Sequence, residues 1–276
     1  MREGARAEHL LALNIGNTFV KAGLFRGETL LARCRFDTLP HASASDYEDA
    51  LNAGLGDWLG PGTHPRRAAF VSVVPSVDAA LHEALARIAG GSAIQIRGDT
   101  PCGLEVTYRP SQALGADRLA NMVAGYARSG GHTIVVDCGT ATTFNCVDRR
   151  ARFVGGAIAP GLKTAAASLG LHAAQLFDPQ ALVLPERYLA LDTLHSLQTG
   201  IVWGHACLIE GLLAGFEKEL TQLEPEVAKA GVKVIATGGW ATLMASACPR
   251  IDEVALDLTL EGVAKIAFFS EEDSYS

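Results

Sequence analysis

The sequence predicts an α/β protein built from two similar lobes that face each other across a cleft. Apolar runs of strand length alternate along the chain with segments of helical, amphipathic spacing. One design also occurs twice: an apolar strand, a polar turn with glycine and threonine, and then further strands. The two copies read LNIGNTFVKAGLF and VDCGTATTFNCVD. Such an internal duplication predicts two lobes, which we place at residues 1–116 and 117–276.

The composition is that of a folded globular protein. The chain has 276 residues, 49% hydrophobic and 19% charged, which allows one or two domains with a sizeable core. Its formal charge of −7 argues against a nucleic-acid partner. Residues 1–9 carry mixed charges and no later segment has 18 uninterrupted apolar residues, so we expect a cytoplasmic protein without membrane contact. The six cysteines lack a C-x-x-C pair and are expected to be buried free thiols.

The first lobe is expected to begin with a three-stranded antiparallel meander. Three apolar runs are separated only by short turns at Gly16 and at Gly27, and tightly connected strands pair with their neighbours. Helices and strands of the lengths typical of α/β folds follow. In chain order we expect strands at 9–15, 18–25 and 29–36, a helix at 47–59, a strand at 68–74, a helix at 77–89, a strand at 92–96 and a loop at 97–112.

The second lobe repeats the strand meander after a helix. The segment DRRA between two apolar runs is typical of a hairpin turn. A long helical stretch contains Gly200 and Gly204, where we expect a bend. In chain order we expect a helix at 113–128, strands at 132–140, 141–148 and 152–159, helices at 160–169 and 192–221, a strand at 232–239, and helices at 239–247 and 258–269.

Three glycine-containing turns each follow an apolar strand. They are Gly16-Asn17-Thr18, Gly139-Thr140-Ala141-Thr142 and Thr237-Gly238-Gly239. Glycine lets a backbone approach a phosphate closely, and hydroxyl and N–H groups can bind the phosphate oxygens. One such turn alone is typical of an ordinary hairpin. Three of them, two in a repeated context, predict nucleotide phosphates held between the lobes.

Four charged residues stand where they could act on such a ligand. Asp137 ends a strand beside the second turn, where a carboxylate can reach a cation near phosphates, or it is a solvated turn residue. Lys21 interrupts an apolar strand and is either a phosphate contact or a sheet-edge lysine. Asp117 and Arg118 fall in the first turn of a helix, which suits an anionic ligand. Asp117 either accepts the proton of an attacking hydroxyl in phosphoryl transfer or simply starts the helix.

The ordered set of motifs resembles the type III pantothenate kinases. This family belongs to the acetate kinase, sugar kinase, Hsp70 and actin superfamily, whose lobes are actin-like (ribonuclease H-like). NIGNTFVKAGLF resembles its first phosphate motif and DCGTATTFNCVD its second. GLEVTYRPSQALGADR is similar to its pantothenate-binding segment and IATGGWA to its adenosine motif, while GGAIAPGL and LDLTLEGV resemble two further stretches of the family. The resemblance covers nearly the whole chain.

The resemblance implies ATP-dependent phosphorylation of pantothenate to 4′-phosphopantothenate, the first step toward coenzyme A. It implies Mg²⁺ with ATP, a monovalent cation (K⁺ or NH₄⁺) at Asp137, and Asp117 as the general base. The implied pantothenate site comprises Tyr108, Gly115, Ala116, Asp117 and Arg118, with Thr193 reaching it from the partner subunit of a homodimer. The implied ATP site comprises Asn14, Ile15, Gly16, Asn17, Thr18, Phe19, Val20, Lys21, Thr140, Gly238 and Gly239.

Asn14 departs from the family pattern Asp-x-Gly-Asn-Thr, in which the aspartate helps to organise magnesium. Asparagine keeps the shape and one oxygen acceptor but loses the charge. If the contact to magnesium runs through water, the change costs on the order of 10- to 100-fold in metal affinity or activity; the sequence leaves a direct contact open. Before Thr193, Asp192 also replaces the usual asparagine. We expect an active kinase with altered metal dependence; the alternatives are a kinase of another small hydroxyl compound and a non-catalytic nucleotide-binding homologue.

Overall fold

The computed structural model describes residues 9–272 except 61–62, 92, 173–181 and 226. The chain forms two compact units. Unit 1 comprises residues 1–124 and 257–276, and unit 2 comprises residues 125–256. These limits differ from the expected division at residue 116/117. The reason is that the C-terminal helix α9 (Leu258–Glu272) returns to pack on the strands of unit 1, a long-range contact that no local pattern reveals.

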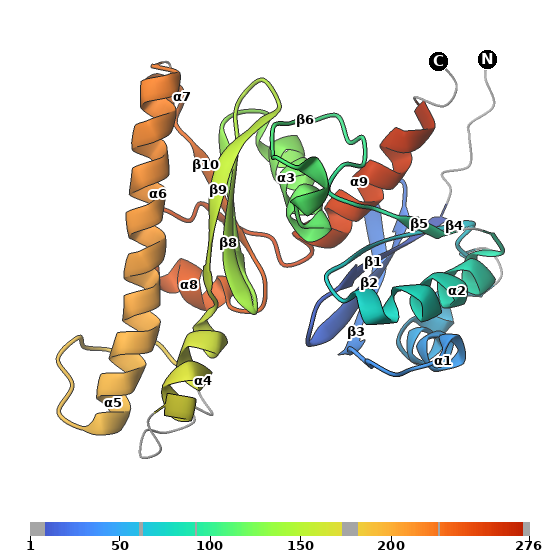
Figure 1. The fold of residues 1–276 in the computed structure, drawn as a ribbon, viewed down its shortest axis with the longest axis horizontal. Coiled ribbons are helices and arrows are strands. Elements are labelled where there is room, and N and C mark those ends of the chain that lie inside the picture. The colour runs from blue at the N-terminus through green and yellow to red at the C-terminus, as the bar shows by residue number, and fades with distance from the viewer. Residues whose placement is uncertain (1–8, 61–62, 92, 173–181, 226, 273–276) are drawn as a thin grey trace. The chain divides into compact units, whose positions relative to one another are not determined.

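Unit 1 contains a five-stranded sheet in the order β3-β2-β1-β4-β5 (Figure 1). The first three strands form the expected antiparallel meander, and the other two run parallel to β1. The strands are β1 (His9–Ile15), β2 (Phe19–Arg26), β3 (Thr29–Asp37), β4 (Arg67–Ser72) and β5 (Ala93–Gln95).

Helices cover both faces of this sheet, which explains why β1 is apolar at nearly every position. Leu11, Leu13 and Ile15 pack into one core with residues of α1 (Ala44–Leu55) and α2 (Asp78–Ala89). The helix α9 covers the opposite face of the sheet. Gly23, on that face of β2, lies so near α9 that a Cβ atom built on it would be 3.2 Å from the Leu260 side chain.

Unit 2 repeats the pairing pattern of unit 1. Its strands lie in the order β11-β10-β7-β8-β9. As β1 does in unit 1, β7 pairs antiparallel with the strand after its turn and parallel with a later strand, so the predicted duplication is confirmed. The strands are β7 (Thr133–Cys138), β8 (Ala141–Val147), β9 (Arg152–Pro160), β10 (Lys233–Thr237) and β11 (Glu253–Val254).

A long helical stretch runs along one side of the unit 2 sheet (Figure 1). It consists of α5 (Thr193–Gln198), a π-helical turn (Thr199–Trp203) and α6 (Gly204–Leu223). The π turn spans Gly200 and adjoins Gly204, so the irregularity falls where the glycines predicted a bend. The remaining helices are α4 (Leu162–His172), α7 (Val227–Ala230) and α8 (Ala241–Ala247).

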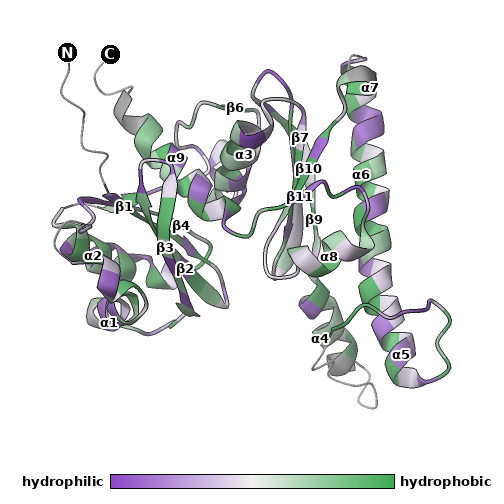
Figure 2. Cartoon of the chain, turned by 180° about the vertical axis from the view of Figure 1, so that it is seen from behind, coloured by the Kyte–Doolittle hydropathy of each residue, from purple (hydrophilic) through white to green (hydrophobic). Residues whose placement is uncertain are grey.

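The stretch Thr193–Leu223, 31 residues, is long and apolar enough to cross a membrane by length and composition alone. Core helices pass the same test. Hydrophobic and hydrophilic residues alternate along α6 (Figure 2), and Ile209 and Leu213 are fully buried in one core with Ile134 and Phe144 of the sheet. We therefore assign it as an amphipathic helix that packs one face on the sheet of unit 2.

Several short elements lie outside the sequence predictions. The expected loop 97–112 contains the two-residue strand β6 (Glu105–Val106) and begins a 3₁₀ turn at Ser111–Ala113. Neither β11 nor α7 was expected. Segments of two to four residues carry no measurable periodicity, so only their tertiary partners specify them. Two further 3₁₀ turns, Gly56–Trp58 and Pro75–Val77, adjoin helices. The helix α3 (Ala116–Ser129) begins in unit 1 and ends in unit 2.

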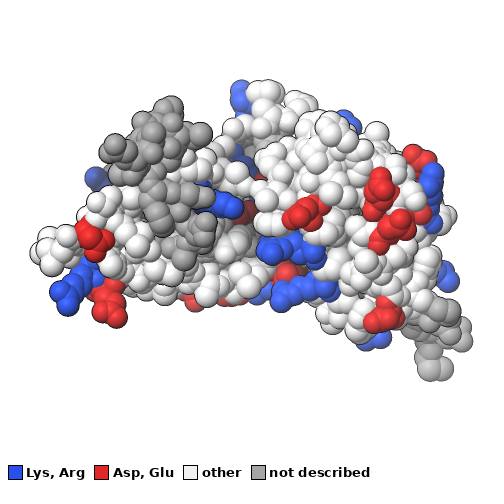
Figure 3. Space-filling model, turned by 90° about the horizontal axis from the view of Figure 1, so that it is seen from below, with Lys and Arg blue, Asp and Glu red and all other residues white. Residues whose placement is uncertain are grey.

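All six cysteines are free thiols. Four are buried as expected, but Cys34 is half-buried and Cys207 is exposed. On the face shown in Figure 3, acidic and basic side chains are interspersed across a largely uncharged surface, as expected for 23 Lys and Arg against 30 Asp and Glu residues.

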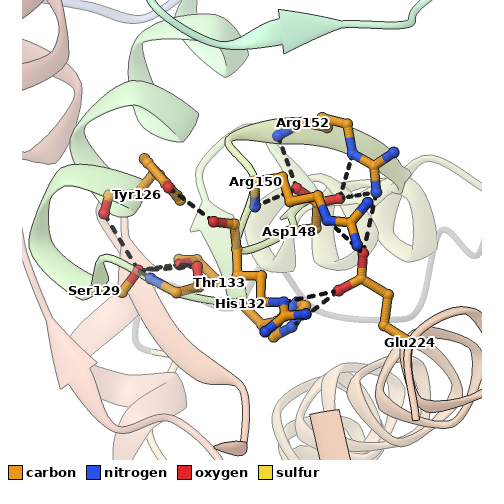
Figure 4. A network of polar contacts seen from close by, with 10 residues as sticks. Tyr126, Ser129, His132, Thr133, Asp148, Arg150, Arg152 and Glu224 are labelled. Carbon is orange, nitrogen blue, oxygen red and sulfur yellow. Dashed lines mark hydrogen bonds and ion pairs between the residues drawn. The ribbon is translucent and has the colours of Figure 1, made fainter. Parts of the chain in front are cut away.

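The hairpin between β8 and β9 is organised by Asp148 (Figure 4). Its carboxylate accepts hydrogen bonds from the backbone N–H groups of Arg150 and Arg152, both at 2.9 Å, and from the Arg152 guanidinium at 2.7 Å. Arg152 also donates to Glu224 at 3.1 Å. Burial alone would raise the pKa of Asp148, but these hydrogen bonds and the Arg152 charge outweigh it and hold the pKa below its usual value.

We predict that Asp148→Asn lowers the free energy of unfolding by about 2 kcal/mol at pH 7, because charge-assisted hydrogen bonds are lost. A lowered folded-state pKa contributes stability that is complete above the unfolded pKa near ~4 and is lost as pH falls through the folded pKa. Urea unfolding should therefore show the gap between wild type and variant closing below about pH 4. The exposed Asp57→Asn serves as control. An equal gap at pH 7 and pH 3 would contradict this role.

Candidate functional site

The first phosphate motif forms the turn between β1 and β2 in unit 1. The Gly16 N–H donates to the Phe19 carbonyl at 3.0 Å, and the Thr38 hydroxyl donates to the Gly16 carbonyl at 2.6 Å. The Thr38 N–H donates to the Thr18 carbonyl at 3.0 Å. These contacts fix the turn while the side chains of Asn17 and Thr18 remain exposed. The exposed polar groups are thus available to a ligand.

Asn14 and Lys21 lie directly opposite each other in the β1–β2 register. Residues opposite one another in an antiparallel pair project from the same face. Because Leu13 and Ile15 face the core with α1 and α2, Asn14 and Lys21 are on the other face, both half-buried. The structure therefore brings an amide and an ammonium group together beside the turn. The neighbours Ile15 and Val20 are fully buried in the core, so they can offer a ligand only backbone groups.

The pantothenate segment places Asp117 and Arg118 in the first turn of α3. Asp117 is half-buried, and its Oδ1 accepts a hydrogen bond from the Arg118 N–H at 2.8 Å. Burial raises the pKa of Asp117 above its ordinary value, although Arg118 acts in the opposite direction. A side chain at Gly115 would lie 2.6 Å from the Asp117 carboxylate, so glycine gives this group its space. Ala116 is buried.

Arg118 is 6% exposed, and its guanidinium lies over the Tyr108 ring at 5.6 Å from the centroid. This distance is within the range of a cation–π contact. The structure thus brings Tyr108 next to Arg118, two residues that the family resemblance implies for one site.

The helix α9 holds α3 in place within unit 1. The Thr259 hydroxyl donates to Asn121 Oδ1 at 2.8 Å, and both residues are buried. A side chain on Gly262 would lie only 1.9 Å from the Ala120 carbonyl, so the two helices touch through their backbones. Asn121 is one turn after Asp117 on α3. Since α9 also packs on β1, it links the strand that carries Asn14 to the helix that carries Asp117.

The second phosphate turn and the adenosine motif lie side by side in unit 2. Asp137 and Thr237 are register partners at the ends of β7 and β10. Gly238 has φ +93°, and a side chain there would lie 2.5 Å from Asp137 Oδ1. The Trp240 N–H donates to the Cys138 carbonyl at 3.1 Å. Glycine at 238 is thus required both by its backbone conformation and by the adjacent carboxylate.

Asp137 offers a carboxylate beside the second phosphate turn. Its carboxylate is half-buried at a strand end, beside the Gly139 turn. Among the described residues, no group of three or more His, Cys, Asp and Glu side chains converges. Any cation at Asp137 would therefore take its other ligands from backbone, hydroxyl or phosphate oxygens.

Thr193 lies apart from these residues, at the start of α5. It is exposed, and the preceding Asp192 caps the helix by accepting a 2.9 Å hydrogen bond from the His195 N–H. The hydrogen bonds from His195 lower the pKa of Asp192. Beside Thr193, Leu189 and Leu191 are 86% and 97% exposed. A depression of about 480 Å³ is lined by residues 183–187 and 189–192 together with His195 and Gln198.

Sequence reasoning missed residues that support the turns from a distance. Thr38 and Thr164 donate hydrogen bonds to carbonyls of the first and second turn, 22 and 24 residues away in the chain. His205 is buried and hydrogen-bonded to Thr142 at 2.9 Å. Burial lowers the pKa of His205. For the contact between Thr164 and the second turn, the sequence offers one signal: Gly161, which follows Pro160 in GGAIAPGL.

The chain is similar to known proteins over most of its length. The family profile described as type III pantothenate kinase matches residues 10–215. A type III pantothenate kinase of Thermus thermophilus is 40% identical over 262 residues, which is 93% of this chain and 98% of the relative. That of Roseiflexus castenholzii is 36% identical over 260 residues, 93% of this chain and 97% of the relative.

Two solved structures support the fold alone. ROK hexokinase from Thermus thermophilus matches with a TM-score of 0.53 at 13% identity, over 96% of this chain and 99% of that one. The activator of 2-hydroxyisocaproyl-CoA dehydratase from Clostridium difficile, with bound ADPNP, matches with a TM-score of 0.52 at 12% identity, over 97% of both chains. The predicted α/β fold of two actin-like lobes is confirmed. The family profile and the relatives from Thermus thermophilus and Roseiflexus castenholzii show that the chain belongs to the type III pantothenate kinase family.

Proposed function

We propose that this protein transfers the γ-phosphoryl group of ATP to the hydroxyl of pantothenate and forms 4′-phosphopantothenate, the first step of coenzyme A synthesis. The observation that carries the proposal is the arrangement at the start of α3. There, a half-buried carboxylate, Asp117, adjoins the guanidinium of Arg118 and the ring of Tyr108. The segment lies within the residues that match the family, and the named relatives match over more than nine-tenths of the chain.

In this reaction Asp117 accepts the proton of the attacking pantothenate hydroxyl. A raised pKa makes a carboxylate a better base, provided that it stays ionised at the working pH. Phosphoryl transfer has a loose transition state, so the protein contributes mainly positioning and charge. The first turn and Lys21 hold ATP phosphates together with Thr140, and Gly238 and Gly239 leave room for the nucleotide. Asn14, on the same face as Lys21, contributes an amide oxygen.

Two cations accompany ATP in this proposal. Mg²⁺ and a monovalent cation, K⁺ or NH₄⁺, supply positive charge at the phosphates. The carboxylate of Asp137 holds the monovalent ion, which suits a site with one protein charge and shared oxygen ligands. Asn14 takes the place of the family's aspartate near magnesium and offers one neutral oxygen.

We further propose a cytoplasmic homodimer in which Thr193 contacts pantothenate bound to the partner subunit. Thr193 is exposed and belongs to unit 2, whereas Asp117 belongs to unit 1. The nearly fully exposed Leu189 and Leu191 stand beside it, and clustered exposed apolar residues are typical of an interaction surface. Neither nucleic acid nor membrane is part of this proposal.

The observation that favours another function is Asn14. Loss of the charge at this position is compatible with a homologue that binds nucleotide without turnover and acts through protein contacts. It is also compatible with a kinase whose acceptor is a different small hydroxyl compound. The first alternative predicts nucleotide binding without ADP release, and the second predicts ADP release that does not depend on pantothenate.

We predict that Asp117→Asn lowers pantothenate-dependent turnover by about 10²- to 10⁴-fold, because the general base is lost. Nucleotide binding, measured by calorimetry, should be unchanged. In wild type, kcat/KM should fall on acidification through a pKa above the ordinary ~4, since the ionised base is required and burial raises its pKa. The exposed Asp49→Asn is the matched control. Near-normal turnover of Asp117→Asn would remove the assigned role.

We predict that Thr193→Val raises the KM for pantothenate and that Thr193→Ser does not, because the hydroxyl is the group in contact. Mixing subunits tests where Thr193 acts. A mixed dimer of Asp117→Asn and Thr193→Val subunits contains one site with both residues intact only if Thr193 serves the partner's site. Unfolding and refolding the two variants together should then restore a wild-type KM in part of the population. Unchanged kinetics after mixing would place Thr193 in its own subunit's site or in none.

A further inference from the structure

The carbonyl of Thr140, in the second phosphate turn, accepts two hydrogen bonds from the start of α4. The Gly161 N–H donates to it at 3.0 Å and the Thr164 hydroxyl at 2.6 Å. A threonine in a helix usually turns its hydroxyl to the carbonyl three or four residues earlier in the same helix. Thr164 instead bonds a carbonyl 24 residues away in sequence. The helix start is therefore bonded directly to the turn.

The backbone of α4 approaches the turn as closely as glycine allows. A side chain on Gly161 would lie 2.2 Å from the Gly139 carbonyl and 2.5 Å from the Thr140 carbonyl. Leu162 and Ala166, which flank Thr164 on α4, are buried in the core of unit 2. These buried side chains anchor α4 to the core, so we expect loss of the Thr164 hydroxyl to act mainly on the turn.

The two hydrogen bonds determine how the turn presents its polar groups. In a planar trans peptide the N–H points opposite to the C=O. With its carbonyl directed to α4, the peptide between Thr140 and Ala141 turns the Ala141 N–H away from that helix. The Thr140 side chain remains exposed. The turn thus keeps its hydroxyl available while its carbonyl, which would repel a phosphate oxygen, is occupied elsewhere.

We propose that Thr164 is a positioning residue for ATP: its hydroxyl holds the Thr140 carbonyl so that the second turn is preorganised to receive phosphate. This inference rests on the proposed function, because it assigns phosphate binding to Thr140. Without the hydroxyl, only the Gly161 N–H holds this carbonyl. More of the turn's ordering then falls to ATP binding, and the affinity for ATP decreases. Pantothenate binding, assigned to residues of unit 1 and to Thr193, should not change.

The test compares Thr164→Val, which keeps the shape but lacks the hydroxyl, with Thr164→Ser, which keeps the hydroxyl. We expect Thr164→Val to raise the KM for ATP about 5- to 10-fold, the effect of one ordinary hydrogen bond. The KM for pantothenate and the thermal midpoint should stay near wild type, and Thr164→Ser should restore the KM for ATP. As a matched control, Thr221→Val removes a 2.7 Å hydroxyl–carbonyl bond within α6 and should leave both KM values unchanged.

A second measurement needs neither ATP nor turnover. Hydrogen exchange of the nucleotide-free protein should be faster over residues 139–142 and at Gly161 in Thr164→Val than in wild type or Thr164→Ser. If exchange differs as expected but wild type does not bind ATP, the proposed function fails and the inference fails with it. If wild type is an active kinase and Thr164→Val has a normal KM for ATP, only the inference is overturned. Equal losses in Val and Ser variants would also overturn it, because the hydroxyl would not be the cause.

Discussion

The close backbone contacts around the end of β7 are the constraint on which the rest of unit 2 depends. Gly238 lies against the Asp137 carboxylate and Gly161 against the carbonyls of Gly139 and Thr140, with distances that no side chain could satisfy. β10 and the start of α4 can occupy their places only because glycine stands at these positions. The contacts place a carboxylate, a threonine hydroxyl and a glycine turn next to one another. Such a group of polar atoms can bind a phosphate and a cation.

In unit 1, other contacts hold the first phosphate turn and the helix that carries Asp117. Its turn is held by Thr38, and its general base candidate stands on α3, which α9 fixes through the backbone contact at Gly262. α9 comes from the far end of the sequence and packs on β1. The position of Asp117 relative to the first phosphate turn is therefore set by the last helix of the chain. A substitution at Gly262 would disturb α3 without touching any proposed ligand.

The sequence was sufficient for the repeated strands and for the chemistry at their ends. The apolar runs of β1 and β7, the glycine turns after them and Asp117 at a helix start are all local patterns. It was insufficient where distant segments meet. In the sequence, Thr164 is one helix residue among others, and only the structure shows its hydrogen bond to the Thr140 carbonyl. Likewise, the periodicity of α9 does not indicate that it packs in unit 1. β6 and β11, at two residues each, exist only through their neighbours.

The geometry of the two phosphate turns bears on what the substitution at Asn14 does to the reaction. If backbone groups and hydroxyls carry most of the phosphate binding, an amide at this position weakens the metal contact but leaves the reaction possible. The most direct measurement is pantothenate-dependent ADP release with ATP, Mg²⁺ and K⁺, in wild type and Asn14→Asp side by side, with Na⁺ replacing K⁺ as control. The proposed function predicts K⁺-dependent turnover in both, with Asn14→Asp needing less Mg²⁺. Turnover confined to Asn14→Asp, or absent from both, would contradict it.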